Sequence, residues 1–289
     1  MKSIFKNLVV RTLSGIIFIS VMIAAILWEP PYLFGIVFLL IAGLGLREFY
    51  TLSAPLTPPE GGKEVKVMGK FSILSGCILF IAFFLYAFRA DPNLRLYSPI
   101  LNFGLYILCV VFIFLMELFR KEKNPVQNIA VSLMGHIYVV IPFAFICLIE
   151  NEHRLLALAF FITIWISDTG AYLAGICFGR HKMFERVSPK KTWEGLAGGM
   201  VFALITGWVF SLVTTTENGE LLKLWQWLVF AWVVFAFGTL GDLVESLFKR
   251  SLNTKDSGFF MPGHGGLLDR FDSTLMAAPI AWLFLEMVK

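Results

Sequence analysis

Charged residues are scarce in this chain of 289 residues, of which 15% are Asp, Glu, Lys or Arg and 58% are hydrophobic. The mean hydropathy of +0.78 is too high for a soluble fold of this length. A bilayer core of about 30 Å requires roughly 20 apolar residues per helix, and runs of that size recur along nearly the whole sequence. The composition therefore excludes a soluble enzyme and predicts an all-α, polytopic integral membrane protein.

Cysteine and histidine are also few, at four residues each. The cysteines stand singly inside apolar runs without paired spacing, which argues against a disulfide framework or a cysteine metal site and indicates small buried residues. His136, His153 and His181 form no cluster in the sequence. The phosphate-binding pattern GxxxxGK[ST] is absent too, which excludes an ATPase of the soluble type as far as a motif can.

Apolar runs predict nine membrane-spanning helices, at about 9–28, 31–50, 70–88, 99–119, 128–149, 155–179, 194–214, 224–248 and 272–288. The first run lacks a small-residue cleavage site and leads straight into another span, so we expect it to be retained rather than removed as a signal peptide. We expect about five spans in residues 1–150 and four catalytic ones in 151–289. The second half also carries two polar cytoplasmic loops, 180–193 and 249–271.

The basic residues indicate the orientation of these spans. With the N-terminus inside, 19 of the 24 lysines and arginines fall on the inner side of the membrane. Such an asymmetry is the positive-inside pattern. We therefore expect the N-terminus and both polar loops to face the cytoplasm from the cell (inner) membrane.

Carboxylates occur where lipid would be expected. Asp168 lies inside the sixth span, Asp242 and Glu245 lie in the last turns of the eighth, and Asp269 and Asp272 open the ninth. Acids in membrane segments are costly and usually face the bundle interior, so they are functional candidates. Since the sixth and eighth spans run inward and the ninth starts inside, we expect these acids to converge near the cytoplasmic surface. Any one of them could instead lie among lipid headgroups beside a basic side chain.

The segment SLFKRSLNTKDSGFFMPGHGGLLDRFD, residues 246–272, interleaves acids and bases in a way that favours phosphate chemistry. Carboxylates hold Mg²⁺ while leaving positions for phosphate oxygens, and Lys and Arg neutralise the remaining charge. Gly263, Gly265 and Gly266 precede a helix N-terminus, where backbone N–H groups favour an anion. Each feature is weak by itself, because such turns often contain glycine and His264 could be an ordinary turn residue.

The same segment resembles the signature of the phosphatidate cytidylyltransferases, also called CDP-diacylglycerol synthases. Every polar position of that signature is present: Ser246, Lys249, Arg250, Lys255, Asp256, Gly258, Pro262, His264, Gly265, Gly266, Asp269, Arg270 and Asp272. The one departure, Met261, is a conservative apolar change. The pieces SDTGAYLAG and SPKKTWEG are also similar to the family's, so the resemblance covers about residue 167 to the C-terminus.

The resemblance implies that CTP and phosphatidate react to give CDP-diacylglycerol and pyrophosphate, with Mg²⁺ required and K⁺ as a second, monovalent cation. The implied partners are CTP, phosphatidate and the bilayer; no nucleic acid is expected, and a homodimer is left open. Two other readings remain. One is a CTP-dependent polyprenol or lipid kinase, and the other is a secondary transporter, in which an intramembrane acid such as Asp168 would be ordinary.

Site residues are assigned from these observations together. We expect Asp242 and Asp269 to hold Mg²⁺, because the Gly-rich turn between their helices can bring both carboxylates to one point; ion pairs with Lys249 and Arg270 are the alternative. Lys249 and His264 join them as catalytic residues. The residues expected to bind substrate are Asp168, Ser188, Lys190, Lys191, Ser246, Arg250, Lys255, Asp256, Gly265, Gly266, Arg270 and Asp272. The lysines of SPKKTWEG are predicted to bind the CTP phosphates or the lipid headgroup, with plain positive-inside charge as the alternative.

Overall fold

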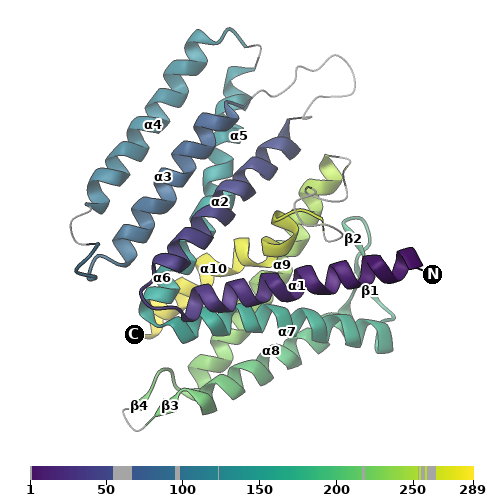
Figure 1. Cartoon of the computed structure of the whole chain (residues 1–289). Helices are drawn as coiled ribbons and strands as arrows, with labels where there is room; N and C mark the ends of the chain where they lie inside the picture. The colour runs from purple at the N-terminus through teal and green to yellow at the C-terminus, as the bar shows by residue number, and fades with distance from the viewer. Residues whose placement is uncertain are drawn as a thin grey trace. The chain divides into compact units, whose positions relative to one another are not determined.

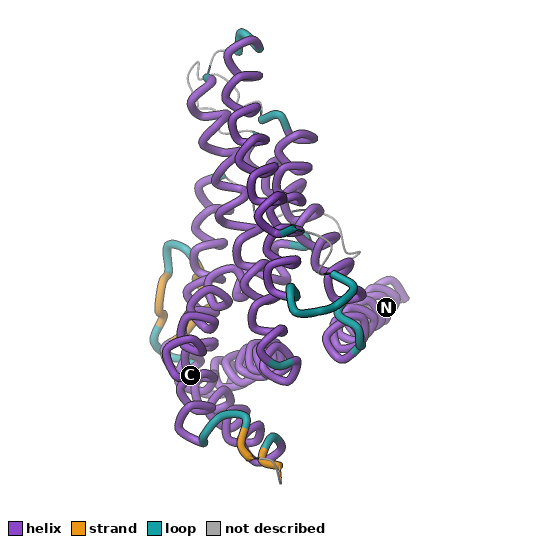
Figure 2. The backbone as a smooth tube through the Cα atoms, turned by 90° about the vertical axis from the view of Figure 1, so that its left-hand side faces the viewer, coloured by secondary structure: helices purple, strands orange, loops and turns teal. Residues whose placement is uncertain are grey.

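The computed structural model describes residues 2–54, 67–94, 98–122, 124–216, 219–252, 254, 258 and 265–289, without the side chains of residues 2–13, 216 and 219. Long helices make up nearly all of this part of the chain, and its strands are confined to two short hairpins (Figure 2). Eight helices within it are long and apolar enough to cross a membrane, and the apolar stretch of α1 adds Ser14–Leu27. The prediction of an all-α polytopic membrane protein with about nine helices is confirmed.

The chain divides into two compact units. Unit 1 comprises Met1–Asn151 and Ser251–Phe271, and unit 2 comprises Glu152–Arg250 and Asp272–Lys289. These units differ from the sequence halves 1–150 and 151–289 in the place of the segment 251–271. That segment, which carries most of the signature, is grouped with the N-terminal helices.

The helices of unit 1 are α1 (Lys2–Leu27), α2 (Tyr32–Ser53), α3 (Gly69–Ala87), α4 (Pro99–Phe119), α5 (Pro125–Gly135), the π-helical turn η1 (His136–Val140) and α6 (Ile141–Glu152). Helices α2 to α5 run side by side (Figure 1). Helix α5, η1 and α6 form one continuous element. It accepts Pro125 in its first turn, where a missing N–H costs little, and Pro142 directly after the wide turn η1.

A hydrogen-bond network is buried between the helices of unit 1. The fully buried His136 places Nε2 2.7 Å from the Ser72 carbonyl oxygen and 3.2 Å from Ser75 Oγ, and Nδ1 3.2 Å from the Tyr106 hydroxyl. Because a carbonyl can only accept, Nε2 carries the proton and Nδ1 accepts from Tyr106. The ring therefore links α3, α4 and η1.

The network continues through α5. The Tyr50 hydroxyl donates to the Ser132 carbonyl oxygen at 2.8 Å, and Ser72 Oγ donates to Ser132 Oγ at 3.1 Å. Toward the end of α4, Asn128 Nδ2 donates to the Glu117 carboxylate, which also pairs with Arg120 at 2.9 Å. These contacts satisfy polar groups that would be costly to bury alone.

The elements of unit 2 are α7 (Arg154–Phe178), β1 (Lys182–Phe184), β2 (Ser188–Thr192), α8 (Trp193–Val213), β3 (Thr215–Thr216), β4 (Gly219–Glu220), α9 (Leu224–Ser251) up to Arg250, and α10 (Leu268–Val288) from Asp272 onward. Strands β1 and β2 pair antiparallel, as do β3 and β4. Helix α10 starts four residues before the predicted residue 272.

Helices α7 and α8 lie side by side (Figure 1) because small residues let their backbones approach. A Cβ atom added to Gly195 would lie 2.9 Å from the Ala171 carbonyl oxygen, and one added to Gly199 would lie 3.1 Å from both Ala171 Cβ and the Ser167 carbonyl oxygen. Close contact between small residues is a usual way of packing membrane helices. This contact sets the spacing of the two helices from which the candidate site is built.

The four cysteines are free, as expected. Cys109 and Cys147 are buried and Cys77 is half-buried, but Cys177 is exposed at the end of α7. The expectation of a buried residue is wrong for Cys177. Its neighbours at the end of α7 are exposed too, since the helix has left the packed part of the unit there.

Candidate functional site

A pocket of about 440 Å³ lies within unit 2, in the size range of small-molecule sites. Its wall on α7 follows one helix face, at steps of three and four residues, over about 12 Å of helix axis. The lining residues are Asp168, Ala171, Tyr172, Gly175 and Ile176 from α7, Met183 from β1, Lys190, Lys191 and Thr192 from β2, Gly195 and Leu196 from α8, and Phe235, Thr239 and Asp242 from α9. The pocket is thus apolar in part and charged in part.

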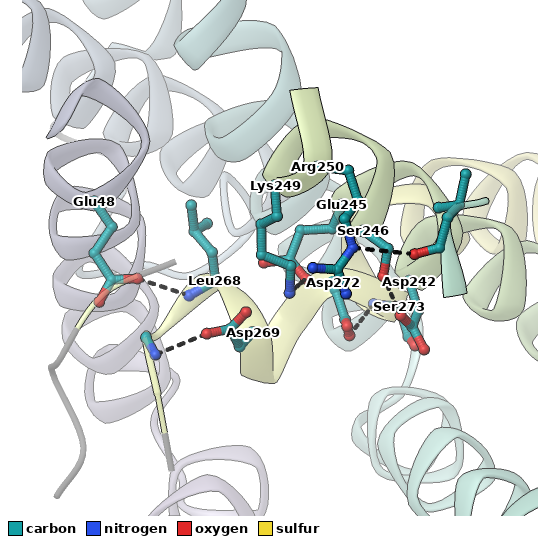
Figure 3. A network of polar contacts seen from close by, with 12 residues as sticks. Glu48, Asp242, Glu245, Ser246, Lys249, Arg250, Leu268, Asp269, Asp272 and Ser273 are labelled. Atoms are coloured by element: carbon teal, nitrogen blue, oxygen red, sulfur yellow. Dashed lines mark hydrogen bonds and ion pairs between the residues drawn. The ribbon is translucent and has the colours of Figure 1, made fainter. Parts of the chain in front are cut away.

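The charged side of the pocket centres on Asp242. Its Oδ2 lies 2.8 Å from Lys191 Nζ, and its Oδ1 accepts a hydrogen bond from Ser246 Oγ at 3.3 Å (Figure 3). Lys191 also donates to the Thr239 carbonyl oxygen at 3.4 Å. Asp168 lines the same pocket and keeps an exposed side chain. Two ammonium groups and two carboxylates therefore share one cavity.

Acidic groups crowd one another around this pocket. Asp168, Asp242 and Asp272 lie close enough for their charges to repel one another. The approach of α10 to α9 causes this crowding, because Gly241 has no side chain and a Cβ there would collide with the Asp272 carbonyl oxygen. Like charges held together favour the binding of a cation.

The β1–β2 hairpin that carries the pocket lysines is attached at its base to α8. The Glu194 carboxylate accepts from the Arg180 amide at 3.1 Å and from the His181 amide at 3.2 Å, and lies 2.6 Å from His181 Nδ1. Thr192 Oγ1 caps α8 by accepting from the Gly195 amide at 3.1 Å. These contacts fix where β2 ends and the first turn of α8 begins.

The end of α9 is attached to the other end of the hairpin. Arg250 Nε donates to the Val187 carbonyl oxygen in the hairpin turn at 3.5 Å (Figure 3). Lys249 Nζ forms an ion pair with Glu245 at 3.1 Å, one helical turn earlier. The cation on Asp242 is thus Lys191, a residue that the sequence analysis did not consider for this pairing.

Gly265, Gly266, Asp269 and Arg270 of the signature lie at or just before the start of α10. Gly265 has a φ of 83°, a conformation that glycine adopts without strain. The Gly266 amide donates to Asp269 Oδ2 at 2.8 Å (Figure 3). The next two amides, of Leu267 and Leu268, donate to the Glu48 carboxylate from α2 at 2.8 and 2.9 Å. Protein carboxylates therefore bind the amides at this helix N-terminus.

The structure brings four predicted site residues into one pocket: Asp168, Lys190, Lys191 and Asp242. Ser246 contacts Asp242, and the half-buried Ser188 begins β2. Asp272 accepts from the Ser273 amide at 2.6 Å (Figure 3), and Arg270 is exposed in the first turn of α10.

Other predicted residues are not brought together. Asp242 and Asp269 belong to different units, so their pairing around Mg²⁺ stays a prediction. Lys255, Asp256 and His264 lie outside the described residues. Among the side chains that the structure does describe, no group of three or more His, Cys, Asp or Glu residues is placed to hold a metal ion.

Sequence reasoning missed Glu194, Thr192 and Glu48. The contacts of Thr192 and Glu194 could have been predicted, because a threonine before a hydrophobic helix with an acid in its first turn marks a helix N-terminus. Glu48 gave no such signal, because its partners are 219 and 220 residues away in the chain.

Comparison with known proteins points to one family. A model described as the cytidylyltransferase family matches residues 9–288. Two proteins named phosphatidate cytidylyltransferase match nearly end to end. The one from Staphylococcus haemolyticus is 33% identical over 94% of this chain and 96% of its own length, and the one from Haemophilus influenzae is 31% identical over 93% and 95%. A relative of the same name from Staphylococcus saprophyticus is 39% identical over 55% of this chain and 60% of its own length. The match thus includes the N-terminal helices, where motifs gave no sign of it.

Proposed function

Because this chain belongs to the cytidylyltransferase family, we propose that it transfers the cytidylyl group of CTP to phosphatidate, giving CDP-diacylglycerol and pyrophosphate. The observation that carries the proposal is the pocket of unit 2, where membrane helices surround both acidic and basic side chains. A lipid phosphate and a soluble nucleotide need such a place to meet. The proposal includes no nucleic-acid partner, and a homodimer remains a prediction.

The reaction makes and breaks one phosphorus–oxygen bond. A phosphate oxygen of phosphatidate attacks the α-phosphorus of CTP. The bond from that phosphorus to the oxygen bridging to the β-phosphate breaks, and pyrophosphate leaves with the electron pair. No covalent intermediate with the enzyme is needed, so the chain contributes by orienting the two phosphates and offsetting their charge.

Lys190 and Lys191 are proposed to bind the phosphates of CTP or of the lipid. Both line the pocket, and contacts with Asp242 and the Thr239 carbonyl oxygen hold the Lys191 ammonium there. A lysine serving only the positive-inside rule would have no reason to pair with an acid in the pocket. These contacts support a positioned, binding role.

Mg²⁺ is the proposed cofactor, and the pocket residues fit it. Asp168 and Asp242 line one cavity and repel each other, and Mg²⁺ typically takes one or two carboxylates together with substrate phosphates. When bound, the ion would neutralise the negative charge that develops on the phosphates during the transfer. The predicted pairing of Asp242 with Asp269, and K⁺ as a second cation, remain part of the proposal.

The pocket is proposed to open to the cytoplasm from the cell (inner) membrane. This orientation follows from the 19 of 24 basic residues that fall on one side. A topology reporter fused after Lys191 is expected to be cytoplasmic, and one fused after Lys223 external. Finding both on the same side would contradict the arrangement of spans.

The direct test is a product assay with the purified, detergent-solubilised protein. Incubation with CTP, Mg²⁺ and phosphatidate is expected to release pyrophosphate and form CDP-diacylglycerol, and samples without phosphatidate are the control. Release of CDP instead would indicate a CTP-dependent lipid kinase. Absence of both products would refute the proposal.

A further inference from the structure

Glu48 connects the N-terminal helices of unit 1 to the signature segment. It lies in the last two turns of α2, and its two carboxylate oxygens accept hydrogen bonds from the Leu267 and Leu268 amides at 2.8 and 2.9 Å. Figure 3 shows the bond to Leu268. These amides belong to the start of α10, where N–H groups have no partner within the helix. Bonds from amides to a carboxylate are the stronger kind, and the helix dipole adds to them.

Glu48 also lies against an earlier part of the same segment. A Cβ atom added to Gly258 would lie 2.7 Å from Glu48 Oε1. The backbone therefore passes this carboxylate both at residue 258 and at residues 267–268. The space taken by Glu48 explains why the signature has a small residue at position 258.

Apolar contacts surround this attachment. Leu268 packs near Gly45, one turn before Glu48 on α2, where an added Cβ would lie 3.4 Å from the leucine side chain. One turn further along α10, the Phe271 ring lies 5.5 Å from Phe18 and 5.1 Å from Phe143, centroid to centroid. Leu267, Leu268 and Phe271 are all buried. Freed amides would thus find little water to replace the Glu48 carboxylate.

We propose that Glu48 is a positioning residue of the cytidylyl transfer, an inference that rests on the proposed function. By holding the amides of Leu267 and Leu268, it fixes the first turn of α10, which carries Asp269 and Arg270. Asp269 is bound to the preceding amide, of Gly266, so its place depends on the same turn. Removing the Glu48 charge leaves two amides without a strong acceptor and loosens the turn.

Hydrogen exchange tests the attachment without any assay of activity. In Glu48→Gln, the amides of Leu267 and Leu268 are expected to exchange at least about tenfold faster than in the unchanged protein, because bonds to a charged acceptor are lost. The matched control is Glu122→Gln, the same substitution in the same unit at a residue whose contact with Arg120 is a loose 3.7 Å. Equal exchange in Glu48→Gln and the control would overturn the proposal.

Steady-state kinetics test the positioning. Glu48→Gln is expected to lower kcat/KM for CTP by about tenfold or more and to raise KM, whereas Glu122→Gln leaves both unchanged. Partial unfolding would lower the maximal rate but leave KM as it was, so an unchanged KM would overturn the positioning role. If the unchanged protein forms no pyrophosphate, the proposed function fails, and the exchange experiment still decides whether Glu48 holds the segment.

A double substitution tests the geometry. Gly258→Ala is expected to lower kcat/KM by a larger factor in the unchanged protein than in Glu48→Asp, because the shorter acid leaves room for the added methyl group. The difference between the two factors measures the coupling of the two positions. Equal factors would show that Glu48 and Gly258 act independently and would count against the proposed arrangement.

Discussion

Polar side chains gather among the helices of both units, but with opposite character. In unit 1, His136 is fully buried and each ring nitrogen has a partner, so the network is closed. In the pocket of unit 2, Asp168 lines the cavity, and Asp242 pairs with Lys191 and repels Asp168. A closed, largely neutral network specifies how helices pack. Crowded charges that open onto a cavity are suited to bind a charged ligand.

Asp242→Asn should cause the largest loss of activity, because it alters the charged pocket of unit 2. The substitution keeps the size of the side chain and removes the charge proposed to hold Mg²⁺, so we expect at least about a hundredfold loss of activity. The folded fraction in detergent is measured alongside, because the substitution also leaves the Lys191 ammonium without its acid. The measurement is pyrophosphate release per folded molecule across Mg²⁺ concentrations, and near-normal activity at limiting Mg²⁺ would reject the role.

The effect of Asp242→Asn needs a control, because Asp242 also forms an ion pair with Lys191. Asp242→Asn leaves the ammonium without its acid, which is itself destabilising. In Asp242→Asn with Lys191→Met, neither charge remains. If Asp242 serves only as an ion-pair partner, the double variant should equal Lys191→Met alone in activity per folded molecule; a further loss relative to Lys191→Met supports the metal role.

Lys190→Arg with Lys191→Arg should have the next largest effect. The charge is kept, but the larger planar guanidinium cannot occupy the position of a compact ammonium between Asp242 and Thr239. We expect about a tenfold loss of kcat/KM with unchanged membrane insertion. Full activity in the double arginine variant would mean that these lysines serve topology alone.

His136→Ala should affect stability and spare the chemistry. Removal of the ring costs Ser75 and the Ser72 carbonyl one of their two partners and takes the ring nitrogen from the half-buried Tyr106 hydroxyl, at a cost of about 1–3 kcal/mol. Denaturation in detergent should show this loss, while activity per folded molecule stays within about twofold. A large loss of activity in a fully stable variant would place the closed network of unit 1 in the reaction.

Ser246→Ala should have the smallest effect of these substitutions. Its hydroxyl contacts Asp242 at 3.3 Å, a long bond that orients the acid from one side. We expect about a twofold to threefold loss of kcat, equivalent to less than 1 kcal/mol. A loss beyond tenfold would indicate that Ser246 contacts the substrate directly, as the signature suggests.

Hydropathy predicted the helices well because their apolar runs are long and separated by polar turns. The predicted start of the last span at residue 272 was late, since Leu267 and Leu268 are buried but the acids after them suppress the local hydropathy. The turn η1 had no sequence signal apart from Pro142. Proline marks a disturbed helix without saying that the turn before it widens.

Sequence signals singled out residues that line the pocket where the signal is local, and missed contacts that depend on packing. The Asp168 side chain and the lysines of β2 could be singled out from charge inside or beside apolar runs. The pairing of Lys191 with Asp242 could not, because it joins a hairpin to a helix 51 residues later. The role of Glu48 was even harder to predict, since nothing around it in the sequence distinguishes it from a surface acid.

The contact between α7 and α8 bears on how mutational scans of this protein would be interpreted. Gly195 lines the pocket and also touches the Ala171 backbone, and Gly199 lies one turn further along α8. A larger residue at either position would push α8 away from α7 and widen the cavity that the two helices enclose. Activity would fall as if a reacting group had been lost. A mutational scan would then score these glycines as intolerant of substitution, like the acids and lysines of the pocket. Their contribution is to set the distance between α7 and α8.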